Sequence, residues 1–329
     1  MLTELKTRGL VRKARKTMAF SRLRQYLPMP EPRPVDDSAR MGEAELVRID
    51  WPQGLPKPRI GLVKDLDRVP RWTKYRRFLE TNGIPHEIYD LHAHDWIEKA
   101  APLDAVINVV SNDLDRLEET RVKYHFLERT LGKRCYPSAD QVLLYENKSL
   151  EAFIAEGCGL PFAKTYISHS REDALAMIEA APYPLVSKID HSSGSLGVEL
   201  VPDVRGASRI VRQAFSRAGR KVHVPWRRQK GYVYFQEFVP NDGFDIRVIL
   251  VGDRAFGYYR RVPKGDFRAS GMNTVERRGL PEEAIRVALE VQRHVDSPQL
   301  VVDMVHGLDG RFVIVEYSII CLMDRPEDL

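Results

Sequence analysis

The run from Tyr183 to Val198 sets the narrowest limits on the fold. The run begins as a buried β-strand that ends in Lys188, and a loop of serines and glycines follows. A strand that ends in a lysine and continues into such a loop can place backbone N–H groups and one ammonium along a polyphosphate. Ordinary turns also have this composition. The run therefore favours nucleotide chemistry without establishing it.

Composition indicates a soluble globular protein. The chain has 329 residues, 43% hydrophobic and 29% charged, which suggests two or three domain-sized units. No apolar run approaches the roughly 18 residues that a membrane-spanning helix needs. The three cysteines are widely spaced and form neither a CxxC pair nor a disulfide pattern. We therefore expect a cytoplasmic location.

Positive charge is concentrated at the N-terminus. Residues 1–26 hold eight lysines and arginines against one acidic residue, whereas the whole chain has a net charge of +5. The rest of the chain is therefore slightly acidic, and a nucleic-acid partner is not expected. Apolar residues along this arm allow an amphipathic helix, which would contact an anionic membrane surface or an acidic partner. A solvated helix without a partner is an equally weighted alternative.

Three further segments differ in composition and in the periodicity of their apolar residues. Residues 27–58 are rich in proline and show no sustained period, which indicates a linker. Residues 59–137 alternate strand and helix patterns, which predicts a parallel α/β domain. Residues 138–329 predict antiparallel hairpins with helices on one side. The expected strands there are the one that residues 165–167 lead into, the one that ends at Lys188, and 198–201, 232–239, 245–251, 255–261, 300–305 and 311–317; the expected helices are 140–154, 171–181, 207–217 and 281–294.

Chemical groups follow a characteristic order through the second half of the chain. They are Lys148, Lys188 with its loop, Gln236 to Val239, Asp245-Ile-Arg247, the run Arg260 to Arg268, Asp303 and Glu316-Tyr-Ser318. From Ile60 to the C-terminus this set resembles the ATP-grasp superfamily. It is most similar to the branch of glutathione synthetase and the RimK-like ribosomal-protein glutamate ligases.

The resemblance implies an α/β N-terminal parallel-sheet domain at 59–137, followed by an α+β ATP-grasp domain. That domain would consist of a small lid subdomain at 138–240 and a large subdomain at 241–329, with the nucleotide between them.

By the same resemblance, ATP is the cofactor and Lys148 and Lys188 contact its phosphates. The expected phosphate loop contains Ser193, Gly194 and Gly197, and the expected adenine hinge is Gln236, Glu237, Phe238 and Val239. Asp245 is the candidate ribose ligand. Three alternatives stay open: Lys148 as a solvated helix lysine, Asp245 as a strand-end cap, and His191 as either a phosphate contact or an ordinary loop residue.

The implied metal ligands are Asp303, Glu316 and Ser318. Two carboxylates that face each other across a hairpin repel unless a cation lies between them, and hard oxygen ligands suit Mg²⁺. The family usually has an asparagine where this chain has Ser318, so the sequence leaves one or two ions open. A second asparagine of the family is replaced near Ala269-Ser270, although Asn273 is close. These departures leave catalytic competence open.

The implied reaction is amide formation. A substrate carboxylate would attack the γ-phosphate of ATP to form an acyl phosphate, and an amine would then displace phosphate. Arg261 and Arg268 would neutralise the transferring group, Arg247 would face the acyl phosphate or the substrate carboxylate, and Arg260 is assigned to the surface. The partners would be small-molecule carboxylate and amine substrates. A phosphotransferase, a non-catalytic nucleotide-binding scaffold and a homodimer stay open.

Overall fold

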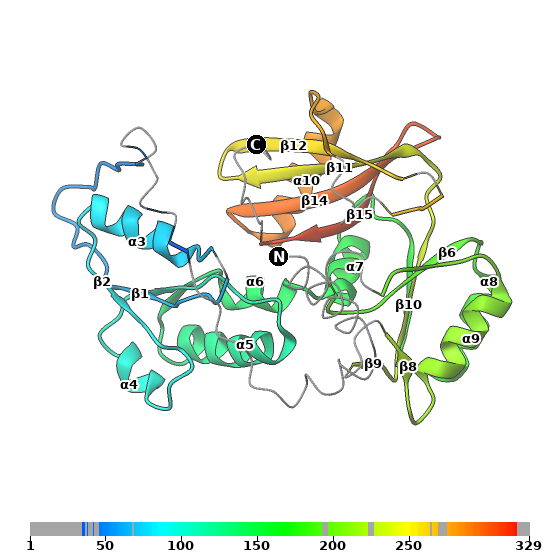
Figure 1. The fold of residues 1–329 in the computed structure, drawn as a ribbon, viewed down its shortest axis with the longest axis horizontal. Coiled ribbons are helices and arrows are strands. Elements are labelled where there is room, and N and C mark those ends of the chain that lie inside the picture. Colours follow the sequence, from blue (N-terminus) through cyan, green and yellow to red (C-terminus); the bar gives the residue numbers. More distant parts are fainter. Residues whose placement is uncertain are drawn as a thin grey trace, which may run out of the picture.

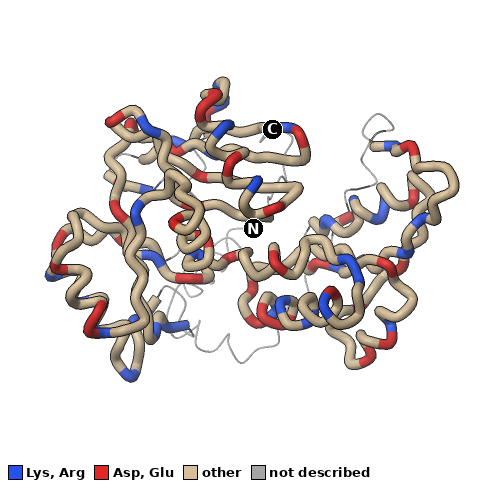
Figure 2. Tube along the Cα trace, turned by 180° about the vertical axis from the view of Figure 1, so that it is seen from behind, with Lys and Arg blue, Asp and Glu red and all other residues tan. Residues whose placement is uncertain are grey.

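The computed structural model describes residues 35–36, 38, 42, 46–67, 69–192, 197–222, 227–263, 265–268 and 275–320. The expected arm at residues 1–26 and much of the 27–58 linker lie outside this set, as do Ser193, Gly194 and Asn273. Among the described helices, none is long and apolar enough to cross a membrane. Basic and acidic residues are interspersed along the described chain rather than gathered by sign (Figure 2).

The first domain is a four-stranded parallel sheet in the order β2-β1-β3-β4 (Figure 1). Helices α3 and α5 cover opposite faces, because alternate strand residues pack against each: Ile60 and Leu62 on the α3 side, Val63 and Val106 on the α5 side. The strands are β1 (Ile60–Leu62), β2 (His86–Ile88), β3 (Ala105–Ile107) and β4 (Arg134–Tyr136), and the helices are α3 (Trp72–Thr81), α4 (Trp96–Ala100) and α5 (Leu114–Arg129). The expected α/β domain is confirmed.

The single helix expected at 140–154 is wrong. The structure has two helices there, α6 (Ala139–Leu144) and α7 (Lys148–Gly157). Glu146 adopts a left-handed conformation at φ 54°, and the Asn147 side chain caps α7 by accepting the Leu150 N–H. The break makes Lys148 the first residue of a helix.

A four-stranded antiparallel sheet follows, in the order β5-β10-β6-β7. Helices α8 and α9 pack on one face through a core that includes Leu185 and Phe235. Because side chains alternate along a strand, Val186 and Lys188 point to the opposite face. The elements are β5 (Thr165–Ser168), α8 (Arg171–Ala180), β6 (Leu185–Lys188), β7 (Glu199–Val201), α9 (Val204–Ala214) and β10 (Val233–Glu237), with a separate hairpin of β8 (Arg220–Lys221) and β9 (Arg228–Gln229).

The last sheet is antiparallel, in the order β13-β12-β11-β14-β15, with α10 against one face. Apolar residues such as Ile246, Val248 and Met304 face α10 in the core, so the alternate residues of β11 and β14 face away from it. Several of those are charged. The elements are β11 (Asn241–Val251), β12 (Arg254–Arg261), β13 (Val275–Glu276), α10 (Glu282–Val295), β14 (Gln299–Gly307) and β15 (Phe312–Ser318).

Residues 139–160 pack into the large core rather than into the core of the smaller sheet. Val142, Leu144, Ala155 and Leu160 belong to the large core shared by α5, β11 and β14. Residues 161–163 also pair with β15, since the Ala163 N–H donates to the Ile314 carbonyl at 2.8 Å. The separate core of the smaller sheet therefore draws on residues from about β5 onward.

Candidate active site

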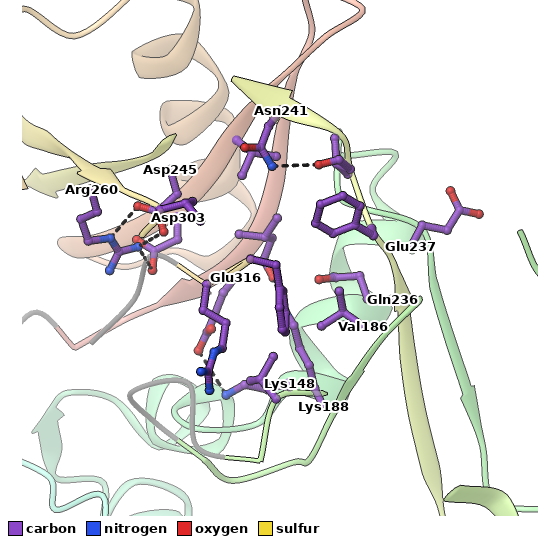
Figure 3. Close-up of a pocket in the computed structure, with 18 of the residues that line it drawn as sticks. Lys148, Val186, Lys188, Gln236, Glu237, Asn241, Asp245, Arg260, Asp303 and Glu316 are labelled. Carbon is purple, nitrogen blue, oxygen red and sulfur yellow. Dashed lines mark hydrogen bonds and ion pairs between the residues drawn. The ribbon is translucent and has the colours of Figure 1, made fainter. Parts of the chain in front are cut away.

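A cavity opens between the two antiparallel sheets (Figure 3). Its free space, open solvent included, is roughly 830 Å³. Apolar side chains line much of its wall, and a few charged side chains converge on it. The lining residues are Lys148, Val186, Lys188, Ser192, Val198, Gln236, Glu237, Phe238, Val239, Asn241, Asp245, Arg260, Val262, Phe267, Arg268, Asp303, Val305, Val315 and Glu316.

The two candidate lysines reach the cavity from different elements. Lys148 begins α7 and is 3% exposed, so the alternative of a solvated helix lysine is wrong. Its ammonium lies 3.1 Å from Glu316 Oε1 and donates to the Ser192 carbonyl. Lys188 ends β6, and its ammonium donates to the Val315 carbonyl at 2.8 Å.

Burial and nearby carboxylates act oppositely on these lysines. Burial lowers the pKa of Lys188, although Glu316 opposes it. For Lys148, burial also acts to lower the pKa, but Glu316, Glu151 and Glu146 outweigh it and the pKa is raised. Lys148 therefore stays protonated, and positively charged, beside Glu316.

Asp303 and Glu316 face each other across β14 and β15, and both line the cavity. Burial acts to raise the pKa of Glu316, but Lys148 and Lys188 outweigh it, so the pKa is lowered. Asp303 behaves alike, since Arg247 and Arg260 outweigh burial and hold its pKa well below the usual range. Both carboxylates are thus ionised at neutral pH.

Ser318 is not among the described residues that line the cavity. Its hydroxyl donates to the Ile320 carbonyl and accepts the Ile320 N–H, each at 3.3 Å. Across the described ranges, no three His, Cys, Asp or Glu side chains gather as a metal cluster. Two of the three expected metal ligands therefore converge on the cavity.

Two arginines and two aspartates form one buried network on the cavity face of the large sheet. Arg247 donates to both Asp303 oxygens, at 2.8 and 2.7 Å. Arg260 donates to both Asp245 oxygens, at 2.6 and 2.7 Å, and lies 2.8 Å from Asp303 Oδ2. Asp245 lies inside β11 rather than at its end, so the strand-end alternative is wrong. Burial raises the pKa of Asp245, with Arg260 opposing it.

The surface assignment of Arg260 is wrong: Arg260, and not Arg261, faces the cavity. Neighbours on a strand point to opposite faces, so the two cannot both reach the cavity. Arg260 is 7% exposed and lines it. The Arg261 side chain is 55% exposed, pairs with Glu276, and lies over the Phe244 ring. Its position gives no support to the expected catalytic role.

Arg247 and Arg268 have different surroundings. Arg268 lines the cavity, and its guanidinium pairs with Asp266 at 2.8 Å. Arg247 is not among the described residues that line the cavity, and its guanidinium forms an ion pair with Asp303, which does line it. Arg247 therefore orients a carboxylate of the cavity.

The expected hinge forms another part of the wall. Gln236 is 2% exposed and donates to Thr165 Oγ1 at 3.1 Å. The N–H groups of Glu237 and Phe238 donate to the carbonyls of Lys164 and Pro184, at 2.8 and 3.2 Å. Within the described part of the chain, the Val239 N–H has no hydrogen-bond partner. It is the hinge donor that a ligand can use.

The expected phosphate loop is described only at its ends. Gly197 has φ 76°, and a Cβ there would lie 2.7 Å from Ile189 Cδ1, so glycine is required. The Ser192 carbonyl accepts from Lys148. Neither Gly197 nor His191 is among the described lining residues.

Two residues beside the cavity were not anticipated. Asn241 lines it, and its amide donates to the Val239 carbonyl at 2.9 Å, which fixes the end of the hinge. Glu151 is 3% exposed, and its carboxylate accepts the Tyr317 N–H at 3.3 Å. Its spacing of three residues from Lys148 on one helix was the available sequence signal.

Fold and site together define an ATP-grasp protein: two sheets hold a cavity with a hinge, two buried lysines and a pair of ionised carboxylates. Residues 143–319 match the RimK-like ATP-grasp domain, more than half of the chain. The chain therefore belongs to the RimK-like ATP-grasp family.

Named relatives and solved structures support the same family. The chain is 23% identical to the alpha-aminoadipate–LysW ligase LysX of Saccharolobus solfataricus over 76% of this chain and 89% of that protein. It is 28% identical to the glutamate–LysW ligase ArgX of Sulfurisphaera tokodaii over 40% and 42% of the two chains. A RimK domain ATP-grasp protein from Sphaerobacter thermophilus superimposes with a TM-score of 0.55 at 19% identity, covering 80% of this chain and 92% of that one. The chain is an ATP-dependent ligase that joins a carboxylate to an amine.

Proposed function

We propose that ATP binds with its base at Gln236–Val239 and its phosphates beside Lys148 and Lys188. The observation that carries this proposal is the convergence of two buried ammonium groups, from α7 and β6, on one cavity. The labelled hinge residues Gln236 and Glu237 lie apart from Lys148 in the cavity (Figure 3). The base and the phosphates of one nucleotide would therefore occupy different ends of the cavity. Val186, Val305 and Val315 supply apolar walls for the base.

The proposed reaction has two steps. A carboxylate oxygen of the substrate attacks the γ-phosphorus, the bond to the β-phosphate oxygen breaks, and ADP leaves. An amine nitrogen then attacks the acyl carbon, phosphate leaves with the C–O electron pair, and the nitrogen loses a proton. Lys148, Lys188 and Arg268 would stabilise the charge that develops on the transferring oxygens. Arg247 and Arg260 would hold Asp303 in place.

We propose Asp303 and Glu316 as the ligands of Mg²⁺. Both are ionised, both line the cavity, and carboxylate oxygens are the ligands that Mg²⁺ prefers. A bound ion would screen the charge of the triphosphate. Arg247 and Arg260 already neutralise much of Asp303, and the Ser318 hydroxyl is turned to Ile320, which favours one ion over two.

For substrates, we propose an amino-acid carboxylate and a small-molecule amine. The named relatives LysX and ArgX act on alpha-aminoadipate and glutamate, which supports this class by analogy. A cytoplasmic location with membrane contact through residues 1–26, and a homodimer, are kept as proposals. Liposome co-sedimentation with and without residues 1–26, and the mass in solution by light scattering, test them.

The testing experiment is thermal unfolding with Mg-ATP for wild type, Lys188→Ala and the control Lys221→Ala, whose side chain is exposed on β8. A ligand at about 100 times its Kd adds roughly 2.7 kcal/mol to the native state. We expect the Tm of wild type and Lys221→Ala to rise, and that of Lys188→Ala to stay unchanged. No rise in any protein, or an equal rise in all three, would contradict the proposed site. Release of free phosphate with an amide product separates the ligase from a phosphotransferase.

A further inference from the structure

A carboxylate at the start of the expected phosphate loop holds the first turn of α7. Asp190 lies two residues after Lys188, and its side chain accepts two hydrogen bonds from Ser149. One comes from the Ser149 N–H at 2.9 Å, and the other comes from the Ser149 hydroxyl at 2.7 Å. Neither residue is among the described residues that line the cavity. The loop is therefore bonded to α7 by groups outside the cavity wall.

Helix α7 already has a cap of its own. The Asn147 side chain accepts the Leu150 N–H at 3.1 Å. A helix leaves its first four N–H groups without partners inside the helix, so a second acceptor can use the one at Ser149. A carboxylate is favoured there, because the N-terminal end of a helix carries partial positive charge. Since α7 packs in the large core and Asp190 follows β6 of the smaller sheet, this second cap also joins the two parts.

Another hydrogen bond runs in the opposite direction between the same two segments. The Lys148 ammonium donates to the Ser192 carbonyl. His191, directly before Ser192, has a left-handed φ of 51°. Residues other than glycine rarely adopt this conformation, and it persists where the surrounding contacts hold it. Residues 148–149 and 190–192 thus form one set of bonds, the α7–loop contact.

The backbone of Asp190 is fixed to the smaller sheet. Its N–H donates to the Tyr232 hydroxyl at 2.9 Å. Tyr232 lies directly before β10, which pairs with β6, and its ring stacks on that of His169 with the centroids 5.9 Å apart. Asp190 is therefore bonded to the smaller sheet through its backbone and to α7 through its side chain.

The α7–loop contact bears on the spacing of the two cavity lysines. Lys148 lies one residue before Ser149, Lys188 lies two residues before Asp190, and both lysines line the cavity. The lysines belong to elements of different cores, so contacts between those elements have to set their separation. A polyphosphate binds more tightly to two ammonium groups that are already in place than to two that it must order.

We propose that Asp190 is a positioning residue for the nucleotide: through Ser149 it holds Lys148 at the separation from Lys188 that a polyphosphate needs. This inference rests on the proposed function and adds to it a residue outside the cavity wall. Without the carboxylate, α7 and the smaller sheet would lose two charge-assisted hydrogen bonds. We expect Asp190→Ala to bind an ATP analogue at least about tenfold more weakly than wild type.

The test is isothermal titration of the full chain with Mg²⁺ and a non-hydrolysable ATP analogue. The proteins are wild type, Asp190→Ala, Asp190→Asn and the control Asp203→Ala. Asp203 is matched, because it caps α9 of the same smaller sheet by accepting the Gly206 N–H at 2.8 Å and is not among the described residues that line the cavity. We expect Asp203→Ala to bind like wild type. Asp190→Asn should recover most of the affinity, because its amide oxygen can accept the Ser149 N–H.

A double-mutant cycle separates positioning from a general structural role. In a Lys148→Met background only one of the two ammonium groups is left, so Asp190→Ala should cost less than about threefold there. The same loss in both backgrounds would overturn the inference. If Asp190→Ala does not fold, Ser149→Ala takes its place. It removes one of the two bonds and should cost about two- to tenfold, and an unchanged affinity would count against the inference.

The titration distinguishes a failure of this inference from a failure of the ATP site. If wild type does not bind the analogue, the ATP site is wrong and this inference falls with it. If wild type binds the analogue and Asp190→Ala binds it equally well, the ATP site stands and the positioning role of Asp190 is refuted.

Discussion

Replacing Arg260 should cost far more stability than replacing its neighbour Arg261. Arg260 holds Asp245 through two hydrogen bonds, of 2.6 and 2.7 Å, and Asp303 through a third contact of 2.8 Å. The side chains of Arg260, Asp245 and Asp303 are 8%, 11% and 9% exposed. In Arg260→Gln, Asp245 would be left as a buried charge without its partner. Removing one partner of a buried ion pair costs about 3–5 kcal/mol.

Arg261→Gln is the matched control, one residue along the same strand. Its side chain is 55% exposed and its pair with Glu276 is open to solvent. Exposed ion pairs contribute about 0–1 kcal/mol. Urea unfolding followed by circular dichroism should therefore place Arg260→Gln at least about 2 kcal/mol below Arg261→Gln. Equal losses in the two variants would refute the assignment of Arg260 to the interior.

Two other predictions concern Glu151 and Gly257. Burial raises the pKa of Glu151 to about 8, with Lys148 opposing and Glu316 adding to it, whereas an unfolded chain loses this proton near pH 4.5. The native state alone keeps the proton between these values, so stability falls by about 1.4 kcal/mol per pH unit as pH rises. Glu151→Gln should remove this pH dependence. Between about pH 5.5 and 7.5, the free energy of unfolding of the variant, measured by urea unfolding, should rise by about 2–3 kcal/mol relative to that of wild type. The same pH dependence in both proteins would contradict the prediction. A Cβ at Gly257 would lie 2.1 Å from the Arg247 carbonyl oxygen, so Gly257→Ala should force β11 and β12 apart and cost at least about 2 kcal/mol. Gly279→Ala, with nothing within 4 Å of its Cβ, is the control and should change the Tm little.

Short-range patterns in the chain were enough to predict most elements. The alternation over residues 59–137 gave the parallel sheet, because each strand and helix there has its own apolar period and stop signal. Lys188 could be placed at a strand end because a short buried strand there changes to a loop of serines and glycines directly after it. The break before α7 was missed, although Asn147 is a good N-terminal cap and could have indicated it.

The sequence could not tell which of Arg260 and Arg261 faces the cavity. Both faces of β12 carry polar residues, so alternation fixes that the two arginines differ but not which one is buried. That choice depends on Asp245, which comes from the adjacent strand β11, and on Asp303, which comes from β14 on the far side of β11. The boundary of the smaller core was likewise set by contacts between residues far apart in the chain, such as Ala163 with Ile314.

By itself, the order of residues determined the family, the sheets and the set of side chains available for chemistry, because these depend on local composition and spacing. Only the folded molecule decided which of those side chains meet. Ser149 and Asp190 are 41 positions apart and carry no shared motif, yet they are hydrogen-bonded, since the start of α7 and the loop after β6 pack together. Convergence of this kind is a property of packing in three dimensions, and no sequence window contains it.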